Sequence, residues 1–431
     1  MPIPPGPSRP GLALLPNVTC PHCWGKFAPE DVLWASEHRE LLGDPILGAQ
    51  QQRRFLPSRF TPEGKALDER GLPCSTLACP LCHLGVPRIL LEIEPLFLSI
   101  LGTPTSGKSY FLAAMTSTLR RVLYERFAVN FTDVDASYNA LLTAFENSLF
   151  MNDKPDEVIP LNTLIQKTQT VGTAYDTVTI SGQSINYPRP FLFAVRAHER
   201  HPTPGLSRVI CLYDNAGEHF LPGEDRTDTP VTRHMALSRV LFFVFDPTQD
   251  PRLQPHCRSG SNGTPRAGQF YRQETVLNEA AARVRTYAGL PSDAKHHRPL
   301  IMILAKSDEW RHLLDSPPGP EPSKKSTDGV HALDGVEIAA RSEMNKKFLT
   351  RYCPEVVAAA EDFCPDTTYV AVSALGDKIE THVESGKPGI RPRNIAPSWV
   401  TVPMLHALAK VDPRLIRRGR RPPGPGGSAK T

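Results

Sequence analysis

Apolar residues in this chain occur in short continuous runs, separated by longer stretches that have helical spacing. The runs Leu96–Leu101, Val209–Tyr213 and Leu300–Leu304 are apolar at nearly every position, as in strands buried on both faces of a sheet. After the first run, apolar residues recur on one helical face: Phe111, Leu112, Met115, Leu119, Val122 and Leu123. The pattern predicts an α/β domain with a mostly parallel sheet and helices on both faces.

The same criteria predict further elements on either side of these runs. We expect strands at Phe127–Thr132, Phe191–Val195, Arg239–Phe245 and Tyr369–Val372. We expect helices at Ala136–Leu149, Glu274–Leu290, Val336–Arg351 and Pro403–Lys410. The segment Asn152–Pro190 is rich in Thr and Pro and predicts no clear element, and Gln249–Pro265 and Ser316–Ser326 are expected to be loops.

The first apolar run leads into a loop of the form G-x-x-x-x-G-K-S, which spans Gly102–Ser109. In such a loop backbone N–H groups hold phosphate oxygens, Lys108 reaches the β- and γ-phosphates, and the Ser109 hydroxyl binds Mg²⁺. The alternative is a helix-capping turn that contains Gly and Lys by chance. The expected nucleotide-binding residues here are Gly102, Thr103, Thr105, Ser106, Gly107, Lys108, Ser109 and Tyr110.

A second motif, Asp214-Asn215-Ala216-Gly217-Glu218-His219, follows another apolar run. An Asp at the end of such a strand is placed to hold Mg²⁺ through a water. The backbone N–H of Gly217 can approach a γ-phosphate. D-x-x-G alone occurs in many turns, but after a buried strand and a phosphate loop it predicts a phosphate-sensing segment.

Two later motifs point to the base of the nucleotide. The strand Leu300–Leu304 ends in Ala305-Lys306-Ser307-Asp308, which has the form N-K-x-D with Ala in place of Asn. Asp308 would accept hydrogen bonds from guanine N1–H and the exocyclic amine, a donor pair that adenine lacks. Lys306 would lie along the base and brace the loop. Ser373-Ala374-Leu375 would bring a backbone N–H to guanine O6.

Composition permits a large folded protein and demands no particular partner. The chain has 431 residues, 40% hydrophobic and 22% charged, with a net charge of +4, so two or three domains are expected and a nucleic-acid partner is not required. No run of 18 apolar residues exists, and the N-terminus lacks the features of a signal peptide. A cytoplasmic location without membrane partners is expected, where thiols stay reduced unless they bind metal.

Four of the nine cysteines form two C-P-x-C pairs, Cys20/Cys23 and Cys79/Cys82. Two such knuckles predict a tetrahedral Cys₄ zinc site. The alternatives are metal-free pairs or a redox C-x-x-C, while Cys74 is a spare thiol and His22 or His83 can replace a thiolate. Residues 24–78 then form an insert with a short helix near Pro29–Leu42, in which Trp24, Phe27 and Trp34 pack on the knuckles.

These patterns divide the chain into four parts. We expect a disordered Pro-rich lead at 1–16, a zinc-knuckle module at 17–88, a P-loop domain at 89–411 and a disordered basic tail at 412–431. The tail carries five arginines and is expected to be solvated, with RNA or anionic-surface contact as the alternative.

With the four motifs in this order, residues 95–410 resemble the TRAFAC class of P-loop GTPases. The Asp214–His219 sequence, the added strand and helix before it, and the zinc knuckles resemble more closely the double-GTPase families of bacterial conflict operons. The resemblance implies a Ras-like fold, GTP hydrolysis to GDP with Mg²⁺ as a molecular switch, and a GTPase-activating or effector protein as partner.

The chain departs from that family pattern at the expected catalytic positions. Glu218 stands where a Gln usually orients the attacking water, which predicts slow turnover without a partner, and His219 is the alternative to Glu218. The Thr that senses the γ-phosphate is left open, as is any arginine finger; the candidates are Thr168, Thr170, Thr173 and Thr177, and Arg189 and Arg226. A nucleotide-holding pseudo-GTPase and an RNA- or ribosome-associated GTPase remain as alternatives.

Overall fold

The structure of the chain is a computed structural model. It describes residues 14–165, 175–180, 182–215, 217–220, 233–258 and 272–419, apart from the side chains of residues 218 and 219. Residues 1–13 of the expected 1–16 lead, the candidates Thr168, Thr170, Thr173 and Arg226, and residues 420–431 therefore lie outside the described residues. Of the lead, Leu15 is described, and its N–H donates to the Leu91 carbonyl at 2.8 Å.

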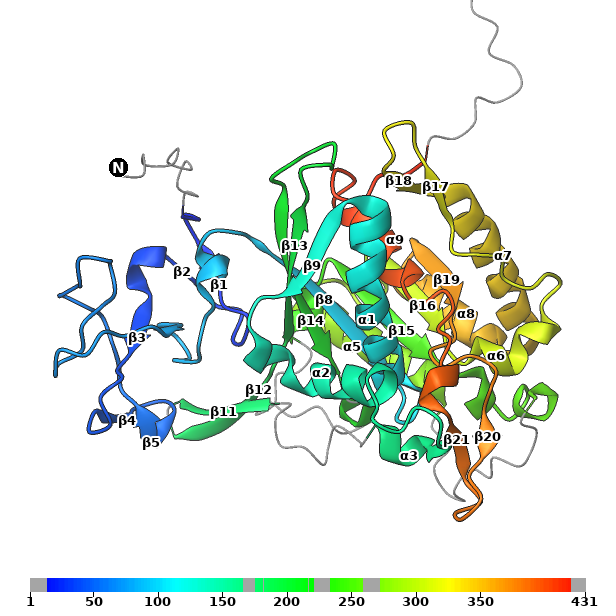
Figure 1. Cartoon of the computed structure of the whole chain (residues 1–431), viewed down its shortest axis with the longest axis horizontal. Coiled ribbons are helices and arrows are strands. Elements are labelled where there is room, and N and C mark those ends of the chain that lie inside the picture. Colours follow the sequence, from blue (N-terminus) through cyan, green and yellow to red (C-terminus); the bar gives the residue numbers. More distant parts are fainter. Residues whose placement is uncertain are drawn as a thin grey trace, which may run out of the picture.

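A seven-stranded sheet with the strand order β19-β16-β15-β8-β14-β13-β9 forms the centre of the molecule (Figure 1). Its strands are β8 (Pro95–Gly102), β9 (Val129–Asp133), β13 (Phe191–Ala197), β14 (Ser207–Asp214), β15 (Val240–Phe245), β16 (Leu300–Leu304) and β19 (Thr367–Ala371). The five strands from β19 to β14 are parallel, whereas β13 runs antiparallel to both β14 and β9. The predicted mixed α/β fold with a mainly parallel sheet is confirmed.

Helices cover both faces of this sheet. One hydrophobic cluster joins it to α1 (Lys108–Phe127), α2 (Ala136–Phe150) and α9 (Val402–Val411). A second cluster on the opposite face contains residues of α4 (Arg233–Leu237), α5 (Gln273–Tyr287) and α8 (Pro354–Phe363). Helix α7 (Gly335–Tyr352) contacts β19 and contributes to both clusters. Neighbouring strand residues such as Val244 and Phe245 enter different clusters because side chains alternate across a sheet.

The chain before β8 forms a separate group of short strands, drawn in blue in Figure 1. They are β1 (Val18–Thr19), β2 (Lys26–Phe27), β3 (Leu33–Ala35), β4 (Leu42–Asp44), β5 (Gly48–Gln52), β6 (Arg54–Phe55) and β7 (Leu77–Ala78). The short helix expected near Pro29–Leu42 is wrong. Only Pro29–Asp31 makes a 3₁₀ turn, because Trp34 then pairs across strands with Phe55 and Leu77. Tertiary pairing of bulky apolar residues overrides the local helical spacing there.

Several small elements were not predicted. The hairpin of β11 (Tyr175–Ile180) and β12 (Gln183–Pro188) lies in the Thr- and Pro-rich segment that predicted no clear element. The remaining elements are short: β10 (Ile159–Pro160), α3 (Leu161–Leu164), α6 (Ser307–Trp310), β17 (Ser323–Lys325), β18 (His331–Leu333), β20 (Glu380–Thr381) and β21 (Pro388–Ile390). In the described part of the chain, no helix is long and apolar enough to cross a membrane.

The C-terminal segment differs from the expected disordered tail. Leu415 and Ile416 are buried in the core, and the Leu333 N–H donates to the Arg417 carbonyl at 2.7 Å. Arg414 pairs with Asp412, and Arg417 pairs with Asp328. Residues 412–419 are therefore part of the folded domain, since burial of two large aliphatic side chains offsets the cost of ordering this segment.

Candidate functional site

The predicted motifs meet at one edge of the central sheet. Strands β8, β14, β15, β16 and β19 are parallel, so the loops that follow them leave from the same edge. The Asn215 amide N–H and Nδ2 both donate to the Ile100 carbonyl at 3.0 Å, which ties the exit of β14 to the end of β8. The edge therefore gathers residues from four separate parts of the sequence.

The loop between β8 and α1 has the backbone that its glycines predict. Gly107 has φ +91°, in the left-handed region that favours glycine, and is the N-cap of the 20-residue α1. The Lys108 Nζ reaches back across the loop to the Gly102 carbonyl at 3.1 Å. Inside the loop, the buried Ser106 hydroxyl has no hydrogen-bond partner among the described residues. An unsatisfied buried hydroxyl beside a helix N-terminus suits a phosphate ligand.

Glycines from two motifs make the closest approaches around the loop. A Cβ at Gly102 would lie 2.5 Å from the Val244 carbonyl of β15. A Cβ at Gly217 would lie 2.4 Å from the Gly102 carbonyl and 2.8 Å from Pro104. Only glycine fits at either position, so the D-x-x-G glycine is packed directly on the phosphate-type loop.

Two glutamines that the sequence analysis missed hold this loop in place. Gln273, at the start of α5, bonds both the N–H and the carbonyl of Asp246, and its Oε1 accepts from the Thr103 hydroxyl at 3.3 Å. Gln249 donates to the Pro104 carbonyl at 3.3 Å and to the Thr105 hydroxyl at 3.1 Å. The only sequence signal was their position after the buried β15 strand, which does not distinguish them from ordinary polar loop residues.

Lys306 lies against the loop as the sequence analysis expected for a bracing residue. Its backbone has φ +53°, and its Cε lies 4.0 Å from the Cβ position of Gly107. The Lys306 Nζ pairs with the fully buried Asp246 at 2.6 Å and also donates to the Thr248 hydroxyl at 3.4 Å. The Lys306 side chain thus runs from the end of β16 across β15 to the loop.

The two motifs expected at the base contact each other. The Ser373 hydroxyl donates to Asp308 Oδ1 at 2.5 Å, and the Gly376 N–H donates to the same hydroxyl at 2.9 Å. Burial raises the pKa of Asp308, against the lowering effect of the Ser373 hydrogen bond. The Ser373 N–H donates to the Ser398 carbonyl at 3.0 Å, so the Ala374 amide is the candidate donor to a guanine base.

The remaining predicted residues lie near this edge or outside the described side chains. Ser109 in the first turn of α1 and Asp214 at the end of β14 are both half-buried. A hydroxyl and a carboxylate are hard oxygen donors of the kind that Mg²⁺ prefers. Tyr110 instead turns toward the core, where its hydroxyl donates to the Leu161 carbonyl. The side chains of Glu218 and His219 are outside the description.

The four predicted thiols form one cluster in the N-terminal group of short strands. Cys20, Cys23, Cys79 and Cys82 are buried, and their Sγ atoms all lie within 4.8 Å of one another. The Cys20–Cys82 and Cys23–Cys79 Sγ separations are 3.7 and 3.8 Å. Zn–S bonds of about 2.3 Å in a tetrahedron require sulfur separations of about 3.8 Å. The donor set and the spacing fit zinc.

In each knuckle the first cysteine sulfur accepts a hydrogen bond from a backbone N–H two residues later. The His22 N–H donates to Cys20 Sγ at 3.4 Å, and the Leu81 N–H donates to Cys79 Sγ at 3.3 Å. The alternative ligands are directed elsewhere. His83 Nδ1 pairs with Asp44 at 2.8 Å, and the spare Cys74 thiol donates to the Leu72 carbonyl. The cluster is therefore a four-cysteine site.

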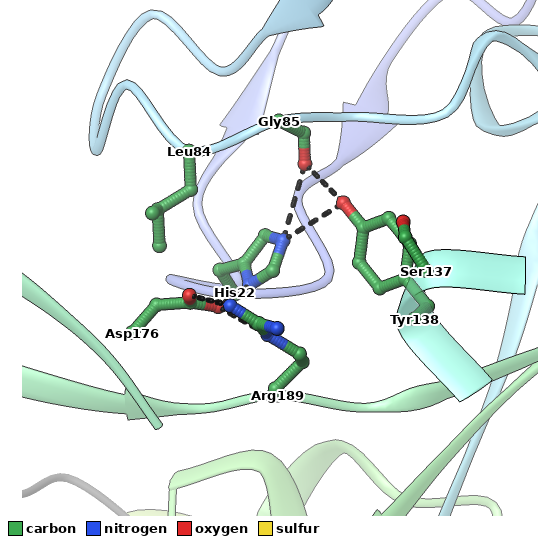
Figure 2. A pocket seen from close by; sticks show the side chains of 7 residues that line it. All are labelled: His22, Leu84, Gly85, Ser137, Tyr138, Asp176 and Arg189. Carbon is green, nitrogen blue, oxygen red and sulfur yellow. Dashed lines mark hydrogen bonds and ion pairs between the residues drawn. The ribbon is translucent and has the colours of Figure 1, made fainter. Parts of the chain in front are cut away.

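A pocket of about 200 Å³ lies where the cysteine module meets α2 and the β11–β12 hairpin (Figure 2). The His22 ring contacts the Gly85 carbonyl at 3.1 Å and the Tyr138 hydroxyl at 3.3 Å, and its Nδ1 lies 3.5 Å from Asp176. Arg189, a candidate arginine finger, pairs with Asp176 and so belongs to this pocket. Candidate Thr177 bonds Asn186 on the hairpin at 2.7 Å. The lining residues are His22, Leu84, Gly85, Ser137, Tyr138, Asp176 and Arg189.

No protein-family model matches the chain. The chain is 24% identical over 318 residues to a Mycolicibacterium smegmatis protein named "Putative ESX-1 scaffolding and assembly protein SaeC", with 69% of this chain and 71% of that protein covered. Among solved structures it is similar to Sup35 complexed with GDP (TM-score 0.24, 13% identity) and with GMPPNP (TM-score 0.22, 12% identity). Each match covers 65% of this chain and 38% of the Sup35 chain, well under two thirds of its length.

Proposed function

We propose that this chain binds GTP and hydrolyses it to GDP with Mg²⁺, as a molecular switch built on a Ras-like P-loop domain. The observation that carries the proposal is the contact of Gly217 with Gly102 and Pro104, which places a D-x-x-G segment directly on a G-x-x-x-x-G-K-S loop. Lys306 beside Gly107 and the Asp308–Ser373 hydrogen bond add the two base-reading motifs to the same edge of the sheet.

In this mechanism each residue has a separate task. The loop amides and Lys108 neutralise charge on the β- and γ-phosphates. Ser109 directly, and Asp214 through a water, hold Mg²⁺, which screens the phosphate charge when it is bound. Gly217 offers its N–H to the γ-phosphate. Asp308 and the Ala374 amide select guanine.

Hydrolysis needs a residue that orients the attacking water. Glu218 is our first candidate and His219 the second, because both follow Gly217 in the sequence. The negative charge of a carboxylate at this position would repel the γ-phosphate, so GTP hydrolysis by the chain alone is expected to be slow. A partner that supplies an arginine in trans would accelerate it by about 10³- to 10⁵-fold.

The proposal is tested by nucleotide competition with purified protein. GTP and GDP should displace a fluorescent guanine nucleotide, whereas ATP should not. Lys108→Ala should abolish GTP binding, and Asp308→Ala should remove the preference for guanine over adenine. Lys387→Ala changes an exposed lysine and serves as the matched control. Equal binding of GTP and ATP to wild type and to Asp308→Ala would remove the guanine assignment.

A second candidate function is a scaffold that holds nucleotide without cleaving it. Glu218 in place of Gln and Ala305 in place of Asn favour it, as does the similarity to a protein named for scaffolding and assembly. A single-turnover assay with GTP separates the two: GDP formation supports the switch, and retention of intact GTP in the presence of partners supports the scaffold. We place the protein in the cytoplasm in either case, with a bacterial defence or signalling operon as its setting.

An RNA- or ribosome-associated role has less support. The tail expected to grip RNA packs on the domain through residue 419, where Arg414 and Arg417 pair with aspartates. For the cysteine cluster we propose one structural zinc ion held by Cys20, Cys23, Cys79 and Cys82, because four thiolates without an open position are typical of structural sites.

A further inference from the structure

The first zinc knuckle is bonded to the strand that carries Asp214. Tyr213 immediately precedes Asp214 on β14 and is fully buried. Its hydroxyl donates to the Pro21 carbonyl at 2.5 Å and accepts from the Trp24 Nε1–H at 3.1 Å. Pro21 lies within the Cys20–Cys23 knuckle, and Trp24 follows it directly. One tyrosine hydroxyl therefore joins the cysteine cluster to the end of β14 by two hydrogen bonds.

A third ring extends this contact to α4. The His234 ring of α4 lies 4.4 Å from the Tyr213 ring and 5.4 Å from the Trp24 ring. Burial lowers the pKa of His234 to about 3, so its ring is neutral and the three-ring group is uncharged. The knuckle therefore contacts both β14 and α4.

The knuckle also touches the β11–β12 hairpin. Tyr187 of β12 packs edge-on against Trp24 with ring centroids 5.7 Å apart, and Asp176 of β11 lies beside His22. The hairpin contains Thr177, one of the candidates for the γ-phosphate-sensing Thr. The knuckle therefore contacts this hairpin as well as β14.

We propose that Trp24 and Tyr213 are positioning residues that couple the zinc site to the Mg²⁺ ligand Asp214, so that zinc binding and GTP·Mg²⁺ binding strengthen each other. The inference rests on the proposed GTPase function and deepens it. Zinc holds the knuckle rigid, the knuckle holds the Tyr213 hydroxyl, and neighbouring strand residues point to opposite faces, so a fixed Tyr213 fixes the direction of the Asp214 carboxylate. Coupling between two binding sites is reciprocal by thermodynamic necessity.

The first test compares nucleotide affinity in buffer with Mg²⁺ and in buffer without Mg²⁺ or a chelator, so that the zinc stays bound. Tyr213→Phe and Trp24→Phe each keep a ring but remove one partner of the shared hydrogen bond. Each should reduce the gain in GTP affinity from Mg²⁺ by about fivefold, while affinity without Mg²⁺ is unchanged. The double variant should lose no more than Tyr213→Phe alone, because the two residues act through one hydroxyl. Tyr369→Phe is the control, since that buried hydroxyl has no partner among the described residues.

The second test measures zinc release to a chromogenic chelator. GTP with Mg²⁺ should slow release from wild type by about fivefold and should leave release from Tyr213→Phe unchanged. An unchanged gain in GTP affinity from Mg²⁺ in both variants, an equal loss of affinity without Mg²⁺, or a zinc release rate that does not depend on nucleotide would overturn the coupling. If wild type binds no guanine nucleotide, the proposed function itself fails; if wild type binds it and the variants match wild type, only the coupling fails.

Discussion

The Ser373 hydroxyl donates a hydrogen bond of 2.5 Å to Asp308 Oδ1, although 65 residues separate the two in the sequence. The bond joins the loops that follow β16 and β19, which are neighbours in the sheet. It fixes the orientation of the carboxylate that we expect to read guanine. Because Asp308 is only 8% exposed, this single hydrogen bond has a large effect on the pKa of its carboxyl group.

The pH dependence of GDP binding tests this relationship. Burial raises the pKa of Asp308, and guanine recognition needs the ionised carboxylate, so affinity should fall as pH drops through that raised pKa. The fall should begin above the usual aspartate range near about pH 4. Ser373→Ala removes a contact that lowers the pKa, so its fall should begin at still higher pH. Binding titrations across acidic pH would measure both, with exposed Ser292→Ala as control. Identical profiles for Ser373→Ala and wild type would contradict this role.

The packing of Gly217 on the loop predicts a steric effect. Gly217→Ala places a methyl group 2.4 Å from the Gly102 carbonyl, so either the loop or the D-x-x-G segment must shift. An overpacking cost of about 1–3 kcal/mol corresponds to roughly five- to 150-fold weaker GTP binding. Isothermal titration would measure it. Gly319→Ala, where a Cβ meets nothing within 4 Å, should bind as wild type does. Unchanged GTP binding by Gly217→Ala would show that the two segments separate in solution.

The cysteine cluster predicts a metal content. Purified protein should carry about one zinc per chain, and the Cys79→Ser/Cys82→Ser double variant should lose it. Elemental analysis measures the zinc, and thermal unfolding should show a lower Tm for the double variant because metal binding contributes to folding. Cys74→Ser changes a buried thiol outside the cluster and should retain zinc. A metal-free wild-type protein with normal Tm would refute the site.

The C-terminal segment predicts a loss of stability on truncating a buried side chain. Ile416 is fully buried, so Ile416→Ala should lower the free energy of unfolding by about 2–4 kcal/mol. Denaturant unfolding would measure the change. Val383→Ala removes a side chain that is 94% exposed and should have little effect. Equal stability of the two variants would mean that residues 412–419 detach from the domain.

The sequence predicted the elements that depend on local patterning. Buried runs such as Leu300–Leu304 became strands with the expected bounds, because a continuous apolar run bounded by polar residues admits few other structures. Sequence patterns did not predict strands whose pairing partners lie far away along the chain. The segment around Trp34 became a strand because Phe55 and Leu77 pair with it, and the β11–β12 hairpin had no signal beyond scattered β-formers.

The residues of the candidate site also fall into those that sequence motifs predict and those that only the fold brings together. Gly102–Ser109, Asp214–Gly217 and the C-P-x-C pairs could be read from the chain because phosphate and metal chemistry demands particular residues at fixed spacings. Gln249 and Gln273 could not, because glutamine is common in loops and only the fold brings these two against Thr103.

The sequence by itself determined the seven buried strands of the central sheet, the presence of a G-x-x-x-x-G-K-S loop and the four thiols. The tertiary structure alone decided that His83 turns to Asp44 and away from the thiols, that residues 412–419 enter the core, and that the Tyr213 hydroxyl joins the first knuckle to β14. The physical reason is distance along the chain: spacing rules act within a few residues, whereas these contacts join positions that only sheet pairing and burial bring together.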